Sequence, residues 1–327
     1  MTTEHKPFPV LQTDRNLALE LVRVTEAAAI AAYHWIGHGD KNEADGAAVE
    51  AMRKAFDAVA IDGTVVIGEG EMDEAPMLFI GERVGAGGPA MDIAVDPLEG
   101  TTLAAKAGPN AMTTLALAER GNFLHAPDIY MDKIAVGGGL PPGVVNLDDS
   151  VANNLRNLAL AKKCDIADLM VCLLDRDRHE QLIAHSREAG ARVMLISDGD
   201  VAAAIATALP DSQIDLYMGA GGAPEGVLSA AALRCVGGQM QGRLLFRNDD
   251  EKARGAKWGI KDLNRKYELQ DLVAGDVVFS ATGVTDGSML RGVHRHGNFI
   301  TTESVVMRSS TGTVRWIKAR HRRETIE

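Results

Sequence analysis

Residues 169–235 read LMVCLLDRDRHEQLIAHSREAGARVMLISDGDVAAAIATALPDSQIDLYMGAGGAPEGVLSAAALRC, and this stretch decides the fold. Short apolar runs alternate in it with segments of helical periodicity. The pattern predicts three strands, each followed by a helix: strands 169–174, 192–196 and 214–218, and helices 179–189, 201–209 and 224–235. Three consecutive strand–helix units of this length are typical of a mainly parallel, doubly wound sheet.

The first half of the chain has a different pattern. It predicts two helices and then a sheet: helices 16–35 and 44–59, and strands 64–67, 91–95 and 112–118. This order is typical of an α+β arrangement. Near the end, segments 277–279 and 304–307 alternate like antiparallel strands, and the sequence leaves open which sheet they join. We therefore predict an α/β protein with an α+β domain at 1–155 and an α/β domain at 156–327, the strands within 276–320 being unassigned.

Composition excludes several classes of protein. The chain has 327 residues, of which 46% are hydrophobic and 24% charged, as in ordinary globular proteins. Its net charge of -11 argues against a nucleic-acid or membrane-surface partner, and an acidic enzyme that handles an anionic substrate commonly uses bound cations. Three scattered cysteines, Cys164, Cys172 and Cys235, form neither a disulfide framework nor a zinc motif. The first residues contain no apolar signal region, so we expect a cytoplasmic protein.

An acidic turn directly follows the predicted strand 91–95. It reads Asp96-Pro97-Leu98-Glu99-Gly100-Thr101-Thr102. The two carboxylates, three residues apart across a proline-stiffened turn, can reach one small volume, and Thr101 adds a hydroxyl group. Magnesium prefers such oxygen ligands together with substrate phosphate. A solvated acidic turn is the alternative interpretation of this motif by itself.

Three further acidic residues lie at similar places. Glu69, in Gly68-Glu69-Gly70-Glu71, follows the predicted strand 64–67, and Asp45 lies on the first turn of the second predicted helix. Glu225 follows Pro224, which suits the first turn of a helix, so its carboxylate is expected at a helix N-terminus. Each residue alone is also compatible with an ordinary exposed carboxylate on the surface. As a group at strand exits they indicate a cation site.

The second half also contains candidate anion-binding residues. Arg176, Asp177 and Arg178 follow a strand and open a helix, where free backbone N–H groups accompany the two arginines. Asp198, Gly199 and Asp200 occupy the matching place one unit later, and these carboxylates suit sugar hydroxyls better than phosphates. Ordinary ion pairing at a helix start is the alternative for the arginines.

Together these segments resemble the class II fructose-1,6-bisphosphatases, within the lithium-sensitive, inositol-monophosphatase-like phosphatase superfamily. The resemblance runs along nearly the whole chain and is carried by GDKNEADGAA at 39–48, GEGEMDEAPM at 68–77, DPLEGT at 96–101, APDIYM at 126–131, SDGD at 197–200 and GGAPEG at 221–226. Glu99 stands where the superfamily usually has Asp, which marks class II. Many relatives have lysine and proline where this chain has Arg176 and Asp177.

The resemblance implies a layered α-β-α-β-α sandwich with the site between two domains. It implies hydrolysis of the 1-phosphate of fructose 1,6-bisphosphate to fructose 6-phosphate, in gluconeogenesis, with Mn²⁺ or Mg²⁺ as cofactor. The implied metal ligands are Asp45, Glu69, Asp96, Glu99 and Glu225, and the implied catalytic residues are Thr101, Glu69 and Asp96. The implied substrate-binding residues are Glu99, Gly100, Thr101, Tyr130, Arg176, Asp177, Arg178, Asp198, Gly199, Asp200 and Gly222. We also expect a homo-oligomer, a dimer or tetramer.

Parts of the sequence also suggest three rival interpretations. A dinucleotide-binding module fits poorly, because Pro224 stands where the third glycine of the fingerprint belongs. A non-catalytic phosphosugar sensor would not need five ligand-type carboxylates and a placed hydroxyl group. The same fold acting on an inositol phosphate, a nucleotide bisphosphate or sedoheptulose 1,7-bisphosphate remains an open alternative, because the metal chemistry would be shared.

Overall fold

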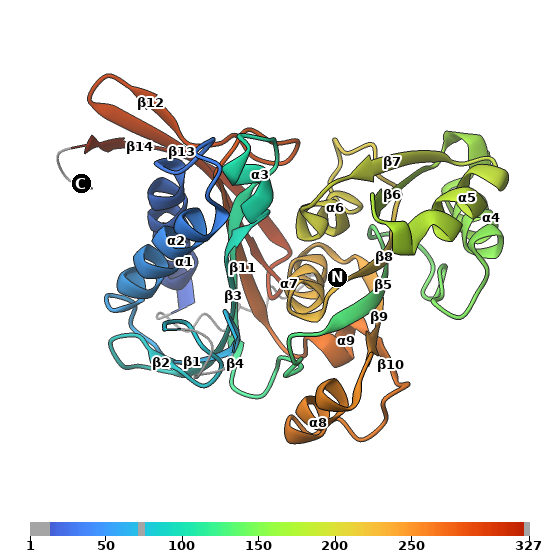
Figure 1. Ribbon diagram of the computed structural model, residues 1–327, viewed down its shortest axis with the longest axis horizontal. Helices are drawn as coiled ribbons and strands as arrows, with labels where there is room; N and C mark the ends of the chain where they lie inside the picture. The colour runs from blue at the N-terminus through green and yellow to red at the C-terminus, as the bar shows by residue number, and fades with distance from the viewer. Residues whose placement is uncertain (1–13, 71–75, 324–327) are drawn as a thin grey trace, which may run out of the picture.

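The computed structural model describes residues 14–70 and 76–323. It consists of two β-sheets and three layers of helices, stacked as α-β-α-β-α (Figure 1). The α/β class predicted from the sequence, and the layered sandwich that the resemblance implied, are confirmed. Within the described ranges, no helix combines the length and apolarity that crossing a bilayer requires.

The first sheet is built from both ends of the chain. Its strands, in spatial order, are β12 (His294–His296), β13 (Phe299–Arg308), β11 (Val277–Gly283), β4 (Met112–Glu119), β3 (Ala90–Glu99), β1 (Asp62–Ile67) and β2 (Arg83–Val84), with β14 (Thr313–Arg322) paired to β13. Only β1 and β3 run parallel. Because β11 pairs with β4 along its whole length, the C-terminal strands that the sequence left unassigned belong to the first sheet.

The second sheet has the order β10 (Lys266–Glu268), β9 (Gln239–Leu245), β5 (Tyr130–Val136), β8 (Leu216–Gly222), β6 (Met170–Leu174) and β7 (Arg192–Ile196). The three strands predicted as strand–helix units, β6, β7 and β8, are parallel neighbours. The sheet as a whole is nevertheless mixed, so the expectation of a mainly parallel sheet is wrong. The strand β5 enters from the first half of the chain and runs antiparallel to both β8 and β9, and β10 runs antiparallel to β9.

Helices cover the outer faces and fill the space between the sheets. The outer helices are α1 (Asp14–Tyr33) and α2 (Lys41–Phe56) on the first sheet and α4 (Val151–Lys162) and α5 (Glu180–Glu188) on the second. The central layer contains α6 (Asp200–Ala206), α7 (Ala223–Val236) and α9 (Leu269–Leu272). Short elements complete the fold: α3 (Thr101–Ala105), α8 (Asp249–Lys257) and the 3₁₀ turns η1 (Ile166–Asp168) and η2 (Asp177–His179).

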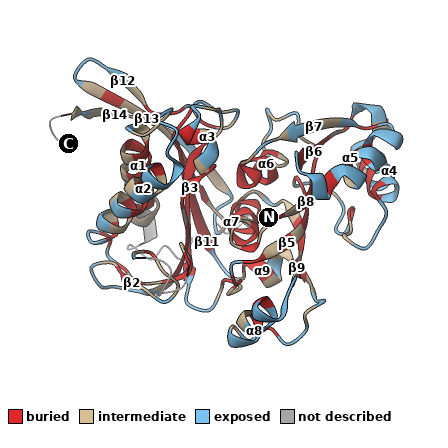
Figure 2. Cartoon of the chain, viewed as in Figure 1, coloured by how far each residue is buried: buried red, intermediate tan, exposed pale blue. Residues whose placement is uncertain are grey.

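The position of α7 follows from its sequence, APEGVLSAAALRCV. Its alanines and other small side chains are buried on all sides (Figure 2), as expected for a helix that packs against sheets on opposite faces. It contacts β3, β4, β11 and β13 of the first sheet and β5, β8 and β9 of the second. This central helix therefore fixes the distance between the two sheets, and its N-terminus lies between them.

Two element boundaries affect the candidate site. Helix α2 begins at Lys41, earlier than predicted, because the Asp40 side chain caps it by accepting hydrogen bonds from the Asn42 and Glu43 N–H groups. Asp45 therefore lies in the second turn rather than the first. Strand β3 continues through the acidic turn to Glu99.

The domain division at residue 155 stays a prediction. The strand pairing shows that β5 joins the second sheet, whereas β11–β14 join the first.

Candidate active site

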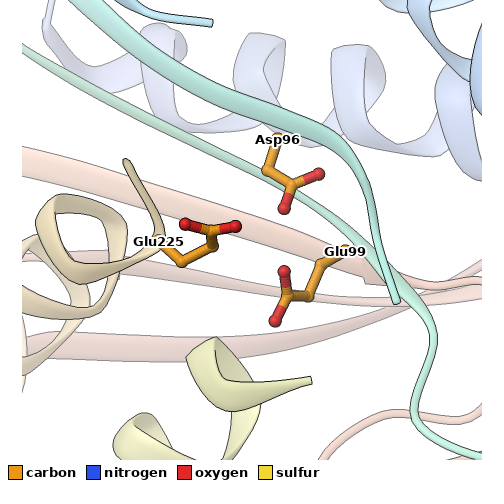
Figure 3. Close-up of side chains that lie close together, drawn as sticks. All are labelled: Asp96, Glu99 and Glu225. Atoms are coloured by element: carbon orange, nitrogen blue, oxygen red, sulfur yellow. The ribbon is translucent and has the colours of Figure 1, made fainter. Parts of the chain in front are cut away.

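Three carboxylates converge where β3 ends and α7 begins. Asp96 and Glu99 come from the last residues of β3, and Glu225 is the third residue of α7. One oxygen atom of each lies within 4.8 Å of the others, and Figure 3 shows the three side chains pointing toward one another. The irregular pairing of β3 with β4 between Asp96 and Glu99 brings both side chains to the same place.

The acidic turn is fixed by backbone contacts. The Leu98 N–H donates to Asp96 Oδ1 at 3.1 Å, and the Val201 N–H of α6 donates to Glu99 Oε1 at 3.2 Å. Gly100 has a positive φ of 81°, a conformation that glycine adopts without strain, and the chain then turns into α3. Glu99 is only 4% exposed, so this turn presents its carboxylates to a buried volume rather than to solvent.

Asp45 and Glu69 lie beside this group. Asp45 and Glu69 shift the pKa values of each other, and the charges of Asp96 and Glu225 both raise the pKa of Glu69. The charge of Asp96 likewise raises the pKa of Glu99. The structure therefore brings together all five residues predicted as metal ligands, from α2, the exit of β1, the end of β3 and the start of α7. Part of the motif at 68–77 lies outside the described residues.

All five carboxyl groups have raised pKa values. Burial is the main cause in each case, and neighbouring carboxylates add to it. The pKa reaches about 9 for Glu69, about 8 for Glu225 and about 6 for Asp45, and the pKa of Glu99 lies well above its ordinary value. Glu225 Oε2 is buried and makes no hydrogen bond with any residue described in the structure. Crowded oxygen ligands of this kind, partly or fully shielded from solvent, fit a hard divalent cation.

Gly222 leaves the space that Glu225 occupies. A Cβ atom at Gly222 would lie 1.8 Å from Glu225 Oε2, although the backbone angles of -61° and 144° suit any residue. The backbone at this position would therefore accept a side chain, but a side chain would displace the neighbouring carboxylate.

Lys133 supplies a positive charge behind the site. This lysine of β5 is 1% exposed, forms a salt bridge with Asp200, and donates to the Gly222 carbonyl oxygen at 3.0 Å. Asp200, 6% exposed, also accepts a hydrogen bond from the Tyr217 hydroxyl group at 3.0 Å. The Lys133 charge counteracts the rise in the pKa of Glu225. Lys133 and Tyr217 were missed by the sequence analysis, although a lysine within the apolar run 129–136 is a detectable signal.

Thr101 is the first residue of α3, and Gly100 occupies the N-cap position. Within the described residues the Thr101 hydroxyl group makes no hydrogen bond, so it does not serve as the helix cap. Thr101 is partly exposed and stands two residues after Glu99. This placement leaves it available to a ligand.

The strand exits of the second sheet gather the remaining predicted residues. Because β6, β7 and β8 are parallel, Arg176 to Arg178, Asp198 to Asp200, and Gly222 lie at one edge. Burial raises the pKa of Asp198, while the positive charges of Arg176 and Lys41 oppose that rise. Gly199 caps α6 with a φ of 85°, and Asp177 begins η2 with an exposed side chain. Lys41, from α2 of the other half, is a further residue that the sequence analysis missed.

Tyr130, the first residue of β5, lies between the end of β8 and the end of β9. It pairs with Gly222 of β8 on one side and Leu245 of β9 on the other. The Arg178 guanidinium carbon lies 4.8 Å from the centroid of the Tyr130 ring, and that of Arg247 lies 4.7 Å from it. Arg247 had no signal in the sequence, because its proximity depends on the pairing of β5 with β9.

The layered fold and the carboxylate cluster are what the resemblance to a class of phosphatases implied, and comparison with known proteins gives the family. Residues 15–321 match the family described as bacterial fructose-1,6-bisphosphatase, glpX-encoded, and the chain belongs to it. The chain is 49% identical to fructose-1,6-bisphosphatase 1 class 2 of Escherichia coli K12 over 322 residues, covering 94% of this chain and 95% of the relative. The class 2 fructose-1,6-bisphosphatase of Shigella flexneri is similar to the same extent, 49% over the same shares.

Proposed function

We propose that the protein uses divalent cations to hydrolyse the 1-phosphate of fructose 1,6-bisphosphate, releasing fructose 6-phosphate and phosphate. The observation that carries the proposal is the cluster of five carboxyl groups, of which Glu99 is buried and the other four are partly buried, and one of which has a buried oxygen atom without a partner among the described residues. Buried carboxylates that repel one another destabilise a fold unless a cation binds them. Membership of the fructose-1,6-bisphosphatase family supports the choice of substrate.

Asp45, Glu69, Asp96, Glu99 and Glu225 would hold the cation or cations, with Mg²⁺ or Mn²⁺ as candidates. A divalent cation bound there supplies neutralising charge for the phosphoryl oxygens and lowers the pKa of a water molecule. The protein itself contributes a fixed arrangement. Hydrogen bonds from Leu98 and Val201 hold the acidic turn, and Lys133 anchors the Gly222 carbonyl group next to Glu225.

Thr101 is proposed to orient the attacking water and to relay its proton: the hydroxyl oxygen atom accepts the proton from the water while the hydroxyl proton passes to the carboxylate of Glu69 or Asp96. The support is positional, because its hydroxyl group has no partner in the described part of the chain and stands beside the carboxylate cluster. Positioned groups of this kind typically contribute about a hundredfold or more to a rate.

The second phosphate and the sugar are proposed to bind at the exits of β6, β7 and β8. Arg176 and Arg178 offer positive charge for the phosphate, and Asp198 and Asp200 offer acceptors for sugar hydroxyl groups, while Asp177, Gly199, Gly222 and Tyr130 line the same edge. Open α/β sheets bind ligands at this edge. Contacts with the remote phosphate orient the reacting one, which favours a bisphosphate over a monophosphate.

The experiment is a phosphate-release assay on a panel of sugar phosphates, with Mg²⁺ and with Mn²⁺. We expect the highest kcat/KM for fructose 1,6-bisphosphate, well above fructose 1-phosphate and inositol 1-phosphate. Equal efficiency on inositol 1-phosphate would contradict the proposal. Activity on sedoheptulose 1,7-bisphosphate is compatible with it, because that sugar also carries two terminal phosphates. A cytoplasmic role in gluconeogenesis and a dimeric or tetrameric assembly remain expectations that accompany this function.

A further inference from the structure

The ring of Tyr130 carries two guanidinium groups that come from distant parts of the sequence. Arg178 belongs to η2, and Arg247 follows β9. Each contact of a guanidinium group with an aromatic ring is attractive. The two cations nevertheless repel each other, and an anion bound next to both would remove that repulsion. Ordinary ion pairing at the surface brings opposite charges together, so it does not explain why two like charges lie on one ring.

Each guanidinium group is held by its own partner and keeps one nitrogen free. Arg178 donates from Nε and Nη2 to the Ala220 carbonyl oxygen, at 3.0 and 2.7 Å. Arg247 donates from Nε and Nη2 to Glu251 Oε1, at 2.8 and 2.6 Å, and its backbone N–H donates to Oε2 at 2.6 Å. Among the described residues, neither Nη1 atom nor the Tyr130 hydroxyl group makes a hydrogen bond. Three donors are therefore available around one ring.

The position of Arg247 does not depend on a flexible surface contact. Glu251 is 1% exposed and is itself fixed, because its N–H donates to the Asn248 side chain at 2.8 Å where α8 begins. The hydrogen bonds from Arg247 lower the pKa of Glu251, so this carboxylate stays charged and holds the guanidinium group in place. Asp128 is the other acidic group whose charge acts on Arg247. Ordering of a side chain before binding reduces the entropy that binding costs.

The distance from the carboxylate cluster suits a substrate with two ends. Tyr130 lies between Gly222, which borders Glu225, and Leu245, two residues before Arg247. Neighbouring strands are about 4.8 Å apart, so two strand steps separate Gly222, next to the cluster, from Leu245, near Arg247, by about 10 Å. A hexose with a phosphate at each end has a comparable length.

We propose that Arg247 is a specificity-determining residue, which binds the phosphate that is not hydrolysed, together with Arg178 and the Tyr130 hydroxyl group. The inference rests on the proposed function, since it assigns a residue to the second phosphate of that substrate. Two guanidinium groups and a phenol hydroxyl group form charge-assisted hydrogen bonds with phosphate, and this set has no counterpart in a monophosphate whose only phosphate is at the reacting end.

The kinetic test compares Arg247→Ala with the wild-type protein on a bisphosphate and a monophosphate. We expect kcat/KM for fructose 1,6-bisphosphate to fall about tenfold to a hundredfold, as for loss of a charge-assisted hydrogen bond, and kcat/KM for fructose 1-phosphate to change less than about threefold. Arg243→Ala is the matched control. Arg243 lies on β9 and is paired with Asp148 at 2.6 Å, so its loss removes the same charge away from Tyr130 and should leave both values unchanged.

A second variant and a binding measurement keep the test independent of catalysis and of folding. Arg247→Lys retains a charge beside Glu251 but loses the planar fork, and we expect most of the loss seen with alanine. Calorimetry with fructose 6-phosphate should show affinity about tenfold weaker in Arg247→Ala and unchanged in Arg243→Ala. If the wild-type protein releases no phosphate from fructose 1,6-bisphosphate, the proposed function fails, and the calorimetry still tests Arg247. Equal affinity in wild-type and Arg247→Ala proteins, or no binding to either, would overturn the inference.

Discussion

Gly222→Ala separates the geometry of the carboxylate cluster from the stability of the fold. The backbone at Gly222 suits alanine, so the substitution introduces no strain and reduces the freedom of the unfolded chain, by about 0.4–1 kcal/mol. The new methyl group would, however, lie 1.8 Å from Glu225 Oε2. Cβ atoms essentially never approach another heavy atom within 3.0 Å, so this oxygen atom must retreat by at least about 1.2 Å.

This displacement should act on cation binding and on rate. A misplacement of about 1 Å in a catalytic arrangement costs on the order of a hundredfold, and we expect kcat/KM to fall by that factor. Affinity for Mn²⁺, measured by calorimetry without substrate, should fall about tenfold to a hundredfold, as it does when groups that support a metal site are lost. The free energy of unfolding in chelator, measured by urea denaturation, should change by less than about 1 kcal/mol.

A control and a double-mutant cycle identify the cause. Gly46→Ala adds a methyl group beside Asp45, where nothing lies within 4 Å, and should leave cation affinity unchanged. In the background of Glu225→Ala, Gly222→Ala should cost almost nothing more, because the clash has been removed. Unchanged Mn²⁺ affinity in Gly222→Ala, or full additivity of the two substitutions, would refute the reasoning and would indicate that the methyl group blocks the substrate instead.

Three further predictions concern other parts of the site. Thr101→Ala should lower kcat by about a hundredfold with melting unchanged, whereas Thr101→Ser should keep most of the activity; a nearly intact kcat in the alanine variant would contradict this role. Lys133→Met leaves the buried Asp200 without its counter-charge and should lower the free energy of unfolding by about 3–5 kcal/mol in urea denaturation, a loss below about 1 kcal/mol being contrary to the account. Because the pKa values of Glu69 and Glu225 are raised to about 9 and about 8 in the fold, their ionisation opposes folding. In chelator, the contribution of these two groups to stability should be greatest below about pH 4, the ordinary pKa of a glutamate, and should be lost as the pH rises toward 9; Mg²⁺ should reduce this loss, and a melting temperature that rises between about pH 7 and about pH 9 in chelator would be inconsistent with it.

The parallel strands of the second sheet could be predicted because each lies within a local strand–helix unit. A short stretch of sequence contains the periodicity and the glycine-rich exit of each unit, and β6, β7 and β8 occur as expected. The strand β5 was not predicted, because Asp132 and Lys133 in its centre interrupt its apolar run. Its polar residues are compensated by partners far away in the sequence, such as Asp200, which no local pattern reveals.

The candidate site divides in the same way. Asp96 and Glu99 could be found from one motif, since a strand end and a turn bring them together. Glu225 was found because a proline and glycines mark the start of its helix. Arg247 and Lys41 could not be found, because each reaches the site through the packing of elements on opposite sides of it. Charged residues that reach the site from distant elements can be recognised only from the three-dimensional arrangement of the sheets.

The measurement that tests the central claim most directly is phosphate release from fructose 1,6-bisphosphate before and after removal of divalent cations, made alongside bound-metal stoichiometry for the wild-type protein and Asp96→Asn. The account predicts that exhaustive chelation abolishes activity, that Mg²⁺ or Mn²⁺ restores it, and that Asp96→Asn, which keeps the shape of the side chain but removes its charge, loses both activity and bound metal while remaining folded. Full activity after chelation, or in Asp96→Asn, would contradict it.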